Sequence, residues 1–229
     1  AANPRTAVVL FNGRPLVLTE LAEIAPAILE MWYPGTEAGS AAARLLFGEA
    51  NPCGKLSVSL ARGTGQYPMA YNHPNTGRPK PEPDSQAFPF TSCYLDMTNR
   101  PLYSFGYGLS YTEFEYQALE LDRDRMTPEE TVRVRITVKN TGSRAGKETV
   151  QLYMRDRVAS VVPPVQQLID YKKIRLEPGE TRTVEFEIRE EQLRFWSFDC
   201  RHISEACEFE ISTGYADHLK LTKTFRLEK

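Results

Sequence analysis

The chain has 229 residues, of which 41% are hydrophobic and 25% charged, and its net charge is −2. This composition is ordinary for a globular protein, and 28 basic against 30 acidic side chains exclude the strongly basic surface of a nucleic-acid or anionic-membrane binder. The apolar runs are too short to span a bilayer, and four irregularly spaced Cys do not make a disulfide scaffold in a chain of this length. The first residues lack the basic and long apolar stretches of a signal peptide, so none is expected. We therefore expect a cytoplasmic protein with free thiols, and with neither nucleic acid nor membrane as a partner.

Charged residues, Pro and Gly are unevenly distributed along the chain. Residues 1–112 contain 16 charged side chains, 12 of the 16 Pro and 10 of the 14 Gly. Residues 113–229 contain 42 charged side chains. This shift predicts two structural units that meet near residues 111–114.

The first unit shows an α/β pattern. The apolar runs 6–11 and 27–33 each end at a turn, as buried parallel strands do, and residues 56–60 are a third probable strand. After the second run, Thr36 is expected to cap a helix that ends at Gly48. Three strands and one or two helices cannot cover both faces of a parallel sheet. We therefore interpret this unit as the end of a larger α/β domain.

The second unit has the pattern of β-strands. Apolar and polar side chains alternate with a period of two over residues 132–138, 150–154 and 184–188, and the pattern returns at 209–211 and 219–225. Turn sequences rich in Asn, Pro and Gly separate these runs. About seven short strands without a long helical pattern predict an antiparallel, immunoglobulin-like β-sandwich. Its charged residues mostly take outward positions and are interpreted as solvated faces.

Five sequence blocks follow one another in the first unit. They are NGRP, WYPGTEAG, NPCGKL, GQYP with YNH and TGRP, and PLYSFGYGLSYT, at residues 12–15, 32–39, 51–56, 65–79 and 101–112. In this order, with a sandwich behind them, they resemble the C-terminal part of glycoside hydrolase family 3, the β-glucosidase and β-xylosidase family. The departures from the family's usual residues are few and fall at turns: Cys53, Ser104 and the pair Ala206-Cys207.

The resemblance implies an architecture for the whole protein. In this family a catalytic barrel is followed by an α/β sandwich domain and often by a fibronectin type III-like domain. Residues 1–112 then correspond to the C-terminal portion of the α/β sandwich domain, and residues 113–229 to the fibronectin type III-like β-sandwich. The fold class is α/β plus all-β, and the implied partners are the N-terminal barrel and the rest of the α/β domain.

The resemblance also implies an activity. Retaining members use two carboxyl groups, one as nucleophile and one as acid/base. The family places the nucleophile in the barrel and the acid/base, where the second domain supplies it, ahead of the strand at residues 6–11. We therefore assign no catalytic residue to this chain, and the family implies no metal or organic cofactor.

The predicted function is that of a fragment of a larger enzyme. The complete protein is expected to be a retaining β-glucosidase-type hydrolase that removes β-linked sugars from the non-reducing ends of β-glucosides or related saccharides. The fragment alone is expected to be inactive. The alternative is a non-catalytic carbohydrate-binding or protein-interaction module, which the sandwich by itself would allow.

A long polar loop between Gly63 and Tyr103 carries the candidate substrate-binding residues. A loop of about 40 residues with little secondary structure is often functional. Planar Arg and amide groups match sugar hydroxyls, so the loop could rim the sugar site, but it could also brace the domain interface, and bracing is favoured. The candidates are Asn72, His73, Arg78 and Asp96, with Tyr94 beside them.

Other residues of suitable chemistry have structural interpretations. Glu37 is expected to be a charge at the start of a helix, and Trp32 a core residue at a strand end rather than a platform for a sugar ring. Four residues of metal-ligating type lie near the C-terminus, but their spacing matches no zinc pattern and no metal site is predicted: Cys200, His202, Cys207 and His218.

Overall fold

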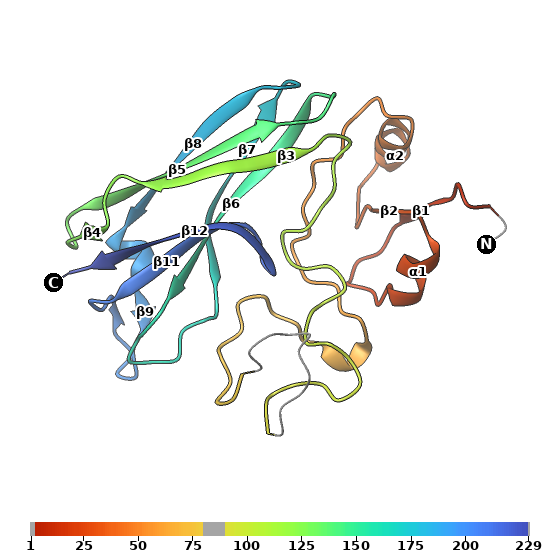
Figure 1. The fold of residues 1–229 in the computed structure, drawn as a ribbon. Coiled ribbons are helices and arrows are strands. Elements are labelled where there is room, and N and C mark those ends of the chain that lie inside the picture. Colours follow the sequence, from red (N-terminus) through yellow and green to blue (C-terminus); the bar gives the residue numbers. More distant parts are fainter. Residues whose placement is uncertain (1–2, 80–89, 229) are drawn as a thin grey trace.

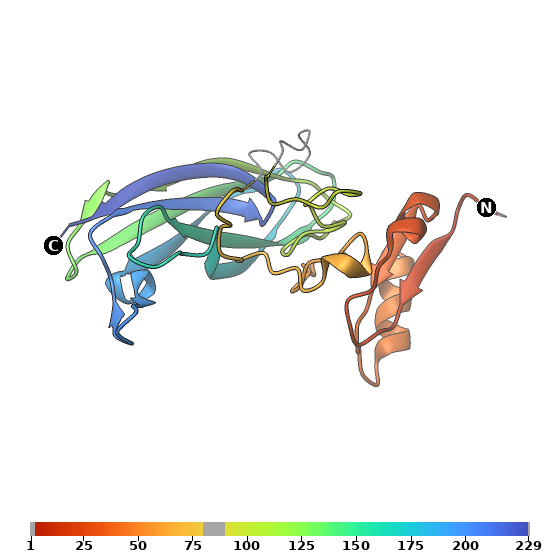
Figure 2. The same cartoon turned by 90° about the horizontal axis from the view of Figure 1, so that it is seen from below.

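The computed structural model describes residues 3–79 and 90–228. A group of N-terminal elements lies beside a larger β-sandwich, and extended segments of the chain run between the two (Figures 1 and 2). No helix among the described residues is long and apolar enough to cross a membrane.

The N-terminal elements are a pair of parallel strands and two helices. β1 (Ala7–Leu10) pairs in parallel with β2 (Ala27–Glu30), and α1 (Thr19–Ile24) lies between them in the chain. α2 (Ala38–Leu46) follows β2, and the short 3₁₀ helix η1 (Thr64–Gln66) comes after it. The two predicted parallel strands are thus confirmed, whereas α1 falls in a stretch for which the apolar pattern predicted only a connection.

Two local predictions for this region are wrong. Thr36 does not cap α2, which begins at Ala38 without a side-chain capping bond, although Gly48 ends it as expected, with a φ of +76° that suits glycine. Residues 56–60 do not join the parallel pair; they run against residues 103–107 instead, through hydrogen bonds such as the one from the Leu60 N–H to the Tyr103 carbonyl (2.8 Å). The apolar character of this run arises because Leu60 is almost fully buried among these extended segments, not because it lies in a sheet.

The larger sheet of the sandwich has five strands. Their spatial order is β4 (Arg125–Met126), β12 (His218–Leu227), β11 (Glu208–Tyr215), β6 (Gly146–Asp156) and β7 (Gln167–Leu176). All neighbours are antiparallel except the short β4, which pairs in parallel with β12.

The smaller sheet has three antiparallel strands. Their order is β3 (Phe114–Leu121), β5 (Thr131–Asn140) and β8 (Thr181–Arg189). The alternation read from the sequence appears directly in their burial, because every second residue is buried in β5 and, from Val184 on, in β8. The predicted antiparallel β-sandwich is confirmed, and the apolar residues of both sheets form one core between them.

Strand β6 differs from its neighbours because it is buried on both faces. Val150, Leu152 and Met154 lie in the core of the sandwich. Gln151 and Tyr153 are also buried, and their side chains contact Gly106 and Tyr71 of the N-terminal region. The outer face of β6 is therefore the surface onto which the preceding part of the chain is packed.

A small hairpin follows β8. The 3₁₀ helix η2 (Glu190–Leu193) leads into β9 (Phe195–Trp196), which pairs with β10 (His202–Ile203) in antiparallel fashion. The hairpin projects from the sandwich at the end remote from α1 and α2 (Figures 1 and 2).

Candidate functional site

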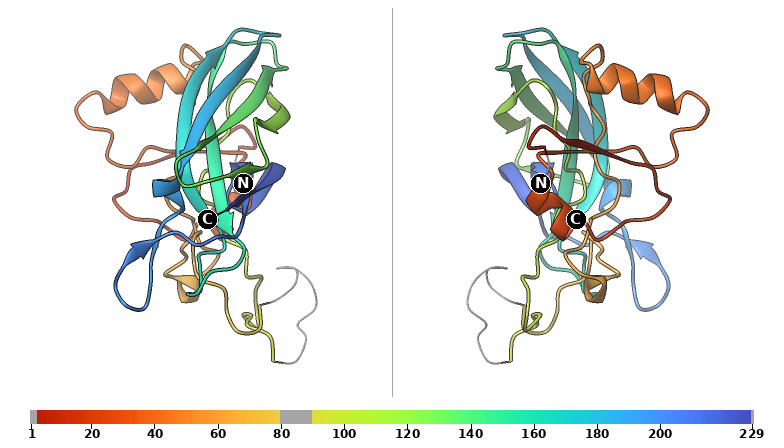
Figure 3. Two further views of the ribbon diagram at one scale, coloured as in Figure 1. Left: turned by 90° about the vertical axis from the view of Figure 1, so that its left-hand side faces the viewer. Right: turned by 90° about the vertical axis from the view of Figure 1, so that its right-hand side faces the viewer.

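The polar loop that carries the candidate substrate-binding residues is described over residues 63–79 and 90–103. Both limbs extend beyond one end of the sandwich (Figures 1 and 3). Gln66, with only 2% of its surface exposed, ties the limbs together, because its side chain accepts from the Arg62 N–H (2.7 Å) and donates to the Thr98 carbonyl (2.9 Å). The base of the loop is therefore fixed by a buried amide.

Tyr71 attaches the first limb to the sandwich. Its ring stacks on Phe105 at 4.0 Å between centroids and meets Tyr153 of β6 edge-on. Its hydroxyl accepts a hydrogen bond from the N–H of Leu168 in β7 (3.2 Å). These contacts join the first limb to three other segments of the chain.

The next two residues, Asn72 and His73, have exposed side chains. The His73 carbonyl accepts from the Val165 N–H (3.0 Å), and the adjacent Pro74 forms an isolated bridge with Pro164. The His73 ring turns back on its own chain, with Nδ1 2.9 Å from the Pro74 carbonyl oxygen. The backbone here attaches the loop to the sandwich.

Arg78 and Asp96 lie further out on the two limbs, and both are exposed. The Arg78 carbonyl accepts from the Ser92 N–H (2.8 Å), which joins the limbs, while its guanidinium lies 5.9 Å from the ring centroid of the exposed Phe90. Tyr94 is part of the second limb, and its N–H donates to Asn99. Among the described residues, no hydrogen bond or ion pair joins any two of the four candidates Asn72, His73, Arg78 and Asp96.

A charged cluster that sequence analysis did not indicate joins the two parts of the chain. Lys55 Nζ lies 3.2 Å from Glu148 Oε2, with side-chain exposures of 16% and 8%, and donates to the Gly108 carbonyl (2.8 Å). The Tyr116 hydroxyl donates to the other oxygen of Glu148 (3.0 Å). Burial, and then the Glu148 carboxylate, raise the pKa of Tyr116 far above its usual range, so the phenol remains a donor.

Lys220 completes this cluster from β12. Its Nζ lies 4.7 Å from the centroid of the Tyr116 ring. Burial lowers the pKa of Lys220, the nearby Lys55 lowers it further, and Glu148 acts in the opposite direction. Lys55 and Glu148 are paired with each other, and the exposed Lys220 lies over the Tyr116 ring. The cluster lies between the two parts of the chain, which is the arrangement of a structural joint rather than of a catalytic centre.

The block at residues 101–112 also contacts the sandwich. Gly106 has a φ of +81°, and a Cβ there would lie 2.4 Å from Gln151 Oε1, so the position requires glycine. Gln151 Nε2 donates to the Gly106 carbonyl (3.1 Å). Ser104, one of the departures from the family pattern, donates to Asp217 beside β12 (2.5 Å).

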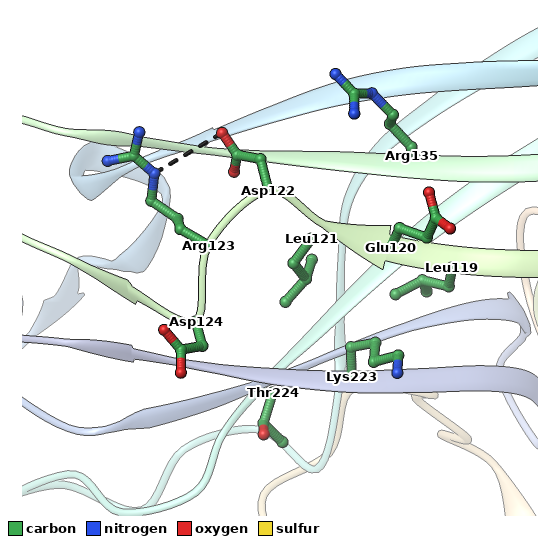
Figure 4. A pocket seen from close by; sticks show the side chains of 9 residues that line it. All are labelled: Leu119, Glu120, Leu121, Asp122, Arg123, Asp124, Arg135, Lys223 and Thr224. Atoms are coloured by element: carbon green, nitrogen blue, oxygen red, sulfur yellow. Dashed lines mark ion pairs between the residues drawn. The ribbon is translucent and has the colours of Figure 1, made fainter.

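An open hollow lies between β3 and β12 at the far end of the sandwich (Figure 4). Carboxylates and basic groups line it in equal number: Glu120, Asp122, Asp124, Arg123, Arg135 and Lys223. Asp122 and Arg123 form an ion pair of 3.7 Å, and Asp122 also accepts from the Arg133 N–H. These are the paired, solvated charges that the alternation of the strands predicted.

A second hollow contains the one thiol that is buried. Cys207 donates to Asp156 (3.2 Å), and the exposed Arg157 and the nearby Glu205 line the same surface. Burial, followed by the Asp156 carboxylate, raises the pKa of Cys207 to about 12, so the thiol stays protonated and is a poor nucleophile at neutral pH.

The remaining candidates are separated in space. Glu37 is exposed at the start of α2, and Trp32 is half-buried just after β2, with a φ of +49°. Cys200 and His202 lie on the hairpin and His218 at the start of β12, and all four Cys are free. In the part of the chain that the structure describes, no group of three or more Asp, Glu, His or Cys is placed to hold a metal ion.

Comparison with family models finds two matches. The model described as glycosyl hydrolase family 3 C-terminal domain matches residues 1–111. The model described as fibronectin type III-like domain matches residues 148–216. These are the α/β region and most of the sandwich.

Similar proteins cover nearly the whole chain. The periplasmic β-glucosidase of Salmonella typhimurium is 45% identical over 208 residues, which are 90% of this chain and 27% of the relative. A β-xylosidase of Formosa agariphila is 40% identical over 96% of this chain and 29% of the relative. A β-glucosidase from Listeria innocua, solved in complex with glucose, superposes with a TM-score of 0.92 at 40% identity, over 97% of this chain and 31% of that one. The chain thus spans less than a third of the length of these relatives.

Proposed function

The chain belongs to glycosyl hydrolase family 3, and from this premise we propose that it is the C-terminal part of a retaining hydrolase that removes β-linked sugars from non-reducing ends. The observation that carries the proposal is the match of residues 1–111 to the family's C-terminal domain, continued into the sandwich by relatives named β-glucosidase and β-xylosidase. β-Glucosides are the first substrate class to test, because a relative from Listeria innocua was solved with glucose and another structure of it with laminaribiose.

The reaction needs groups that we place outside this chain. A retaining glycosidase holds two carboxyl groups about 5–5.5 Å apart, one to attack the anomeric carbon and one to protonate the leaving oxygen and then activate water. Glu37 and Asp96 are the carboxylates in or near family blocks, and both are exposed on separate elements. The barrel and the rest of the α/β domain are therefore the proposed partners that supply the catalytic pair, and the chain alone is proposed to be inactive.

The part assigned to this chain is to hold the polar loop in a fixed place. Tyr71 and the His73 backbone attach the loop to the sandwich, while the side chains of Asn72, Arg78 and Asp96 remain exposed. A braced backbone with exposed tips allows a sugar to meet groups that are already positioned, which lowers the entropy lost on binding. We place Asn72, His73, Arg78 and Asp96 at the rim of the substrate site on this basis.

We propose that the chain divides into two domains, residues 1–112 and 113–229. The first strand of the sandwich, β3, begins at Phe114, which supports this boundary. The expected cytoplasmic location stays a prediction, since the relative from Salmonella typhimurium is named a periplasmic enzyme. Fractionation of the source cells with an antibody to the chain will decide between the two compartments.

The test of the function is turnover by the complete protein. We expect it to release 4-nitrophenol from 4-nitrophenyl β-D-glucoside or β-D-xyloside with retention of the anomeric configuration. NMR of the first sugar formed measures that configuration. An α-glucoside of the same leaving group is the matched control and should give the background rate. Inversion at the anomeric carbon, or no turnover of any β-glycoside, would contradict the proposal.

A further inference from the structure

The hairpin β9–β10 presents large aromatic side chains to solvent. Trp196 is 67% exposed and Phe198, in the turn, is 87% exposed. The Trp196 ring stacks on His202 of the facing strand, with 5.0 Å between ring centroids and 26° between the planes. Among the described residues nothing covers this indole, and the stacked His202 ring holds it flat.

The two faces of the hairpin differ in how far they are buried. In the antiparallel register, Trp196 lies opposite His202 and Phe195 opposite Ile203, so the two pairs project from opposite faces. Phe195 and Ile203 are half-buried, whereas Trp196 and His202 are exposed. The stacked pair therefore belongs to the outward face and takes no part in the core of the sandwich.

The turn holds this face in one geometry. The Ser197 N–H donates to the Arg201 carbonyl (2.9 Å), and the Cys200 N–H donates to the Ser197 carbonyl (3.0 Å). Asp199 accepts from the Ser197 hydroxyl and from the Arg201 guanidinium. The platform is thus formed before any ligand arrives, which reduces the entropy lost on binding.

We propose that the outward face of the β9–β10 hairpin is a saccharide-binding site that takes a hexopyranose unit of a β-glucan on the Trp196 ring. The C–H groups of a β-hexopyranose gather on one face of the ring, and that flat apolar face fits an exposed indole, whose face is electron-rich. The indole N–H makes no hydrogen bond among the described residues, and Asp199 and Arg201 lie exposed in the same turn. These groups supply donors and acceptors for hydroxyls around the stacked ring.

The surroundings favour a saccharide over a protein partner. Beyond Trp196 and Phe198, the hairpin and η2 display charged side chains: Glu191, Arg194, Asp199 and Arg201. A stable protein interface buries about 1,200–2,000 Å² in total around an apolar centre, and two rings among charges do not offer that area. The site lies apart from the polar loop. Its choice of a β-glucan as ligand rests on the proposed function, but binding is measured without turnover, so failure of the site and failure of the hydrolase are distinguishable.

Binding is tested by NMR titration of the full chain with laminarihexaose, a β-linked glucose hexamer. The chain has two Trp, so two indole N–H signals are expected, and a Trp32→Phe variant assigns them. We expect the Trp196 signal and the amides of the turn to shift, with a Kd of about 1 mM or weaker, and the Trp32 signal to stay in place. Trp196→Ala should weaken binding by about tenfold or more, because the face on which the sugar stacks is lost; tenfold corresponds to about 1.4 kcal/mol.

Two controls keep the outcome decisive. Tyr171→Ala removes another exposed aromatic residue, on β7, and should leave the Kd within about twofold of the parent value. Trp196→Phe keeps an aromatic face and should retain part of the affinity, and unchanged amide spectra show that each variant is folded. The proposal is overturned if the hexamer shifts no hairpin signal, if Trp196→Ala binds as the parent does, or if sedimentation shows that copies of the chain associate through the hairpin.

Discussion

The sandwich and the N-terminal region are stabilised in different ways. Among the described residues, buried apolar side chains before β3 are few: Leu18, Ala42, Leu60 and Ala61. From Leu119 onward there are 21 of them, and 19 form a single core between the two sheets. The N-terminal region instead exposes large apolar groups, with Phe11 at 55%, Ile24 at 70% and Phe47 at 84%.

The difference shows where each region obtains its stability. The sandwich buries its own apolar faces and needs no other part of the chain for its core. The N-terminal region is held by specific polar contacts to β6 and to the residues just before β12, among them Lys55 with Glu148, Gly106 with Gln151 and Ser104 with Asp217. In the proposed complete enzyme, the barrel and the rest of the α/β domain would cover its exposed apolar groups.

The largest expected effect comes from separating the two regions. Isolated residues 113–229 should unfold in one cooperative transition, because the core lies wholly within them. Isolated residues 1–112 should aggregate or stay unfolded, because they lose the buried joint and keep their exposed apolar side chains. Circular dichroism melts and NMR spectra of both pieces provide the measurement, and well-dispersed peaks from soluble residues 1–112 would break the comparison.

Glu148→Ala should destabilise the whole chain by about 3 kcal/mol, which corresponds to a fall in Tm of roughly 6–12 °C. The reason is that it leaves Lys55, which is mostly buried, without its carboxylate, and removes the acceptor of Tyr116. Glu185→Ala is the matched control, since its ion pairs with Arg133 and Arg135 are about half exposed and should contribute under about 1 kcal/mol. Equal melting temperatures for the two variants would show that the joint contributes no stability.

Gly106→Ala should cost about 2 kcal/mol in the free energy of unfolding, measured by urea titration. A methyl group would meet the Gln151 side chain, and the φ of +81° disfavours any residue with a Cβ. Gly65→Ala is the control, because nothing lies within 4 Å of a Cβ there and its φ is not positive, so the change should stay within about 0.5 kcal/mol.

Arg78→Ala sharpens the role of the loop. Its guanidinium is exposed and contacts Phe90 alone among the described residues, so the melting temperature should change little. If the side chain touches the sugar, the complete enzyme should lose roughly 10- to 100-fold in kcat/KM, as expected for a charge-assisted hydrogen bond of about 1.5–3 kcal/mol. A lower melting temperature with unchanged kcat/KM would show instead that Arg78 braces the loop.

The smallest expected effect is a dependence of stability on pH through Asp156. Burial raises the pKa of this carboxyl in the folded state, so stability falls as pH rises from the unfolded value of about 3.9 through the folded pKa. Asp156→Asn removes this loss and can still accept from Cys207. The variant should have a slightly higher urea midpoint than the parent at pH 7 and the same midpoint at pH 3, and the reverse order at pH 7 would contradict the assignment.

Much of the fold could be predicted because the sandwich strands alternate cleanly. Val132, Val134, Ile136 and Val138 alternate with polar residues and are all fully buried on β5. Strand β7 was not singled out, because its sequence interrupts the alternation with Tyr171, Lys172 and Lys173, which are exposed. Edge strands of this kind take their structure from pairing with a neighbour, here β6, rather than from their own pattern.

The joint could not be predicted for a different reason. Lys55 and Glu148 are 93 positions apart, and in the sequence neither can be told from an ordinary exposed charged residue. Residues 56–60 resemble a parallel strand because a short apolar run shows only that it is buried, not which elements it packs against. The polar character of the loop was enough to predict an exposed segment with candidate binding residues. The attachment of the loop through Tyr71 could not be predicted, because it depends on contacts with β6 and β7 that only the fold brings near.

The central claim is that this chain supports a glycosidase whose catalytic carboxyl groups lie elsewhere in the protein. The most direct measurement is the turnover of 4-nitrophenyl β-D-glucoside by the purified 229-residue chain beside the complete enzyme. The chain alone should give only the background rate, because neither a carboxyl pair nor a sugar pocket is assigned to it. Turnover near that of the complete enzyme, lost on Glu37→Gln or Asp96→Asn, would contradict the account and place the active site within these residues.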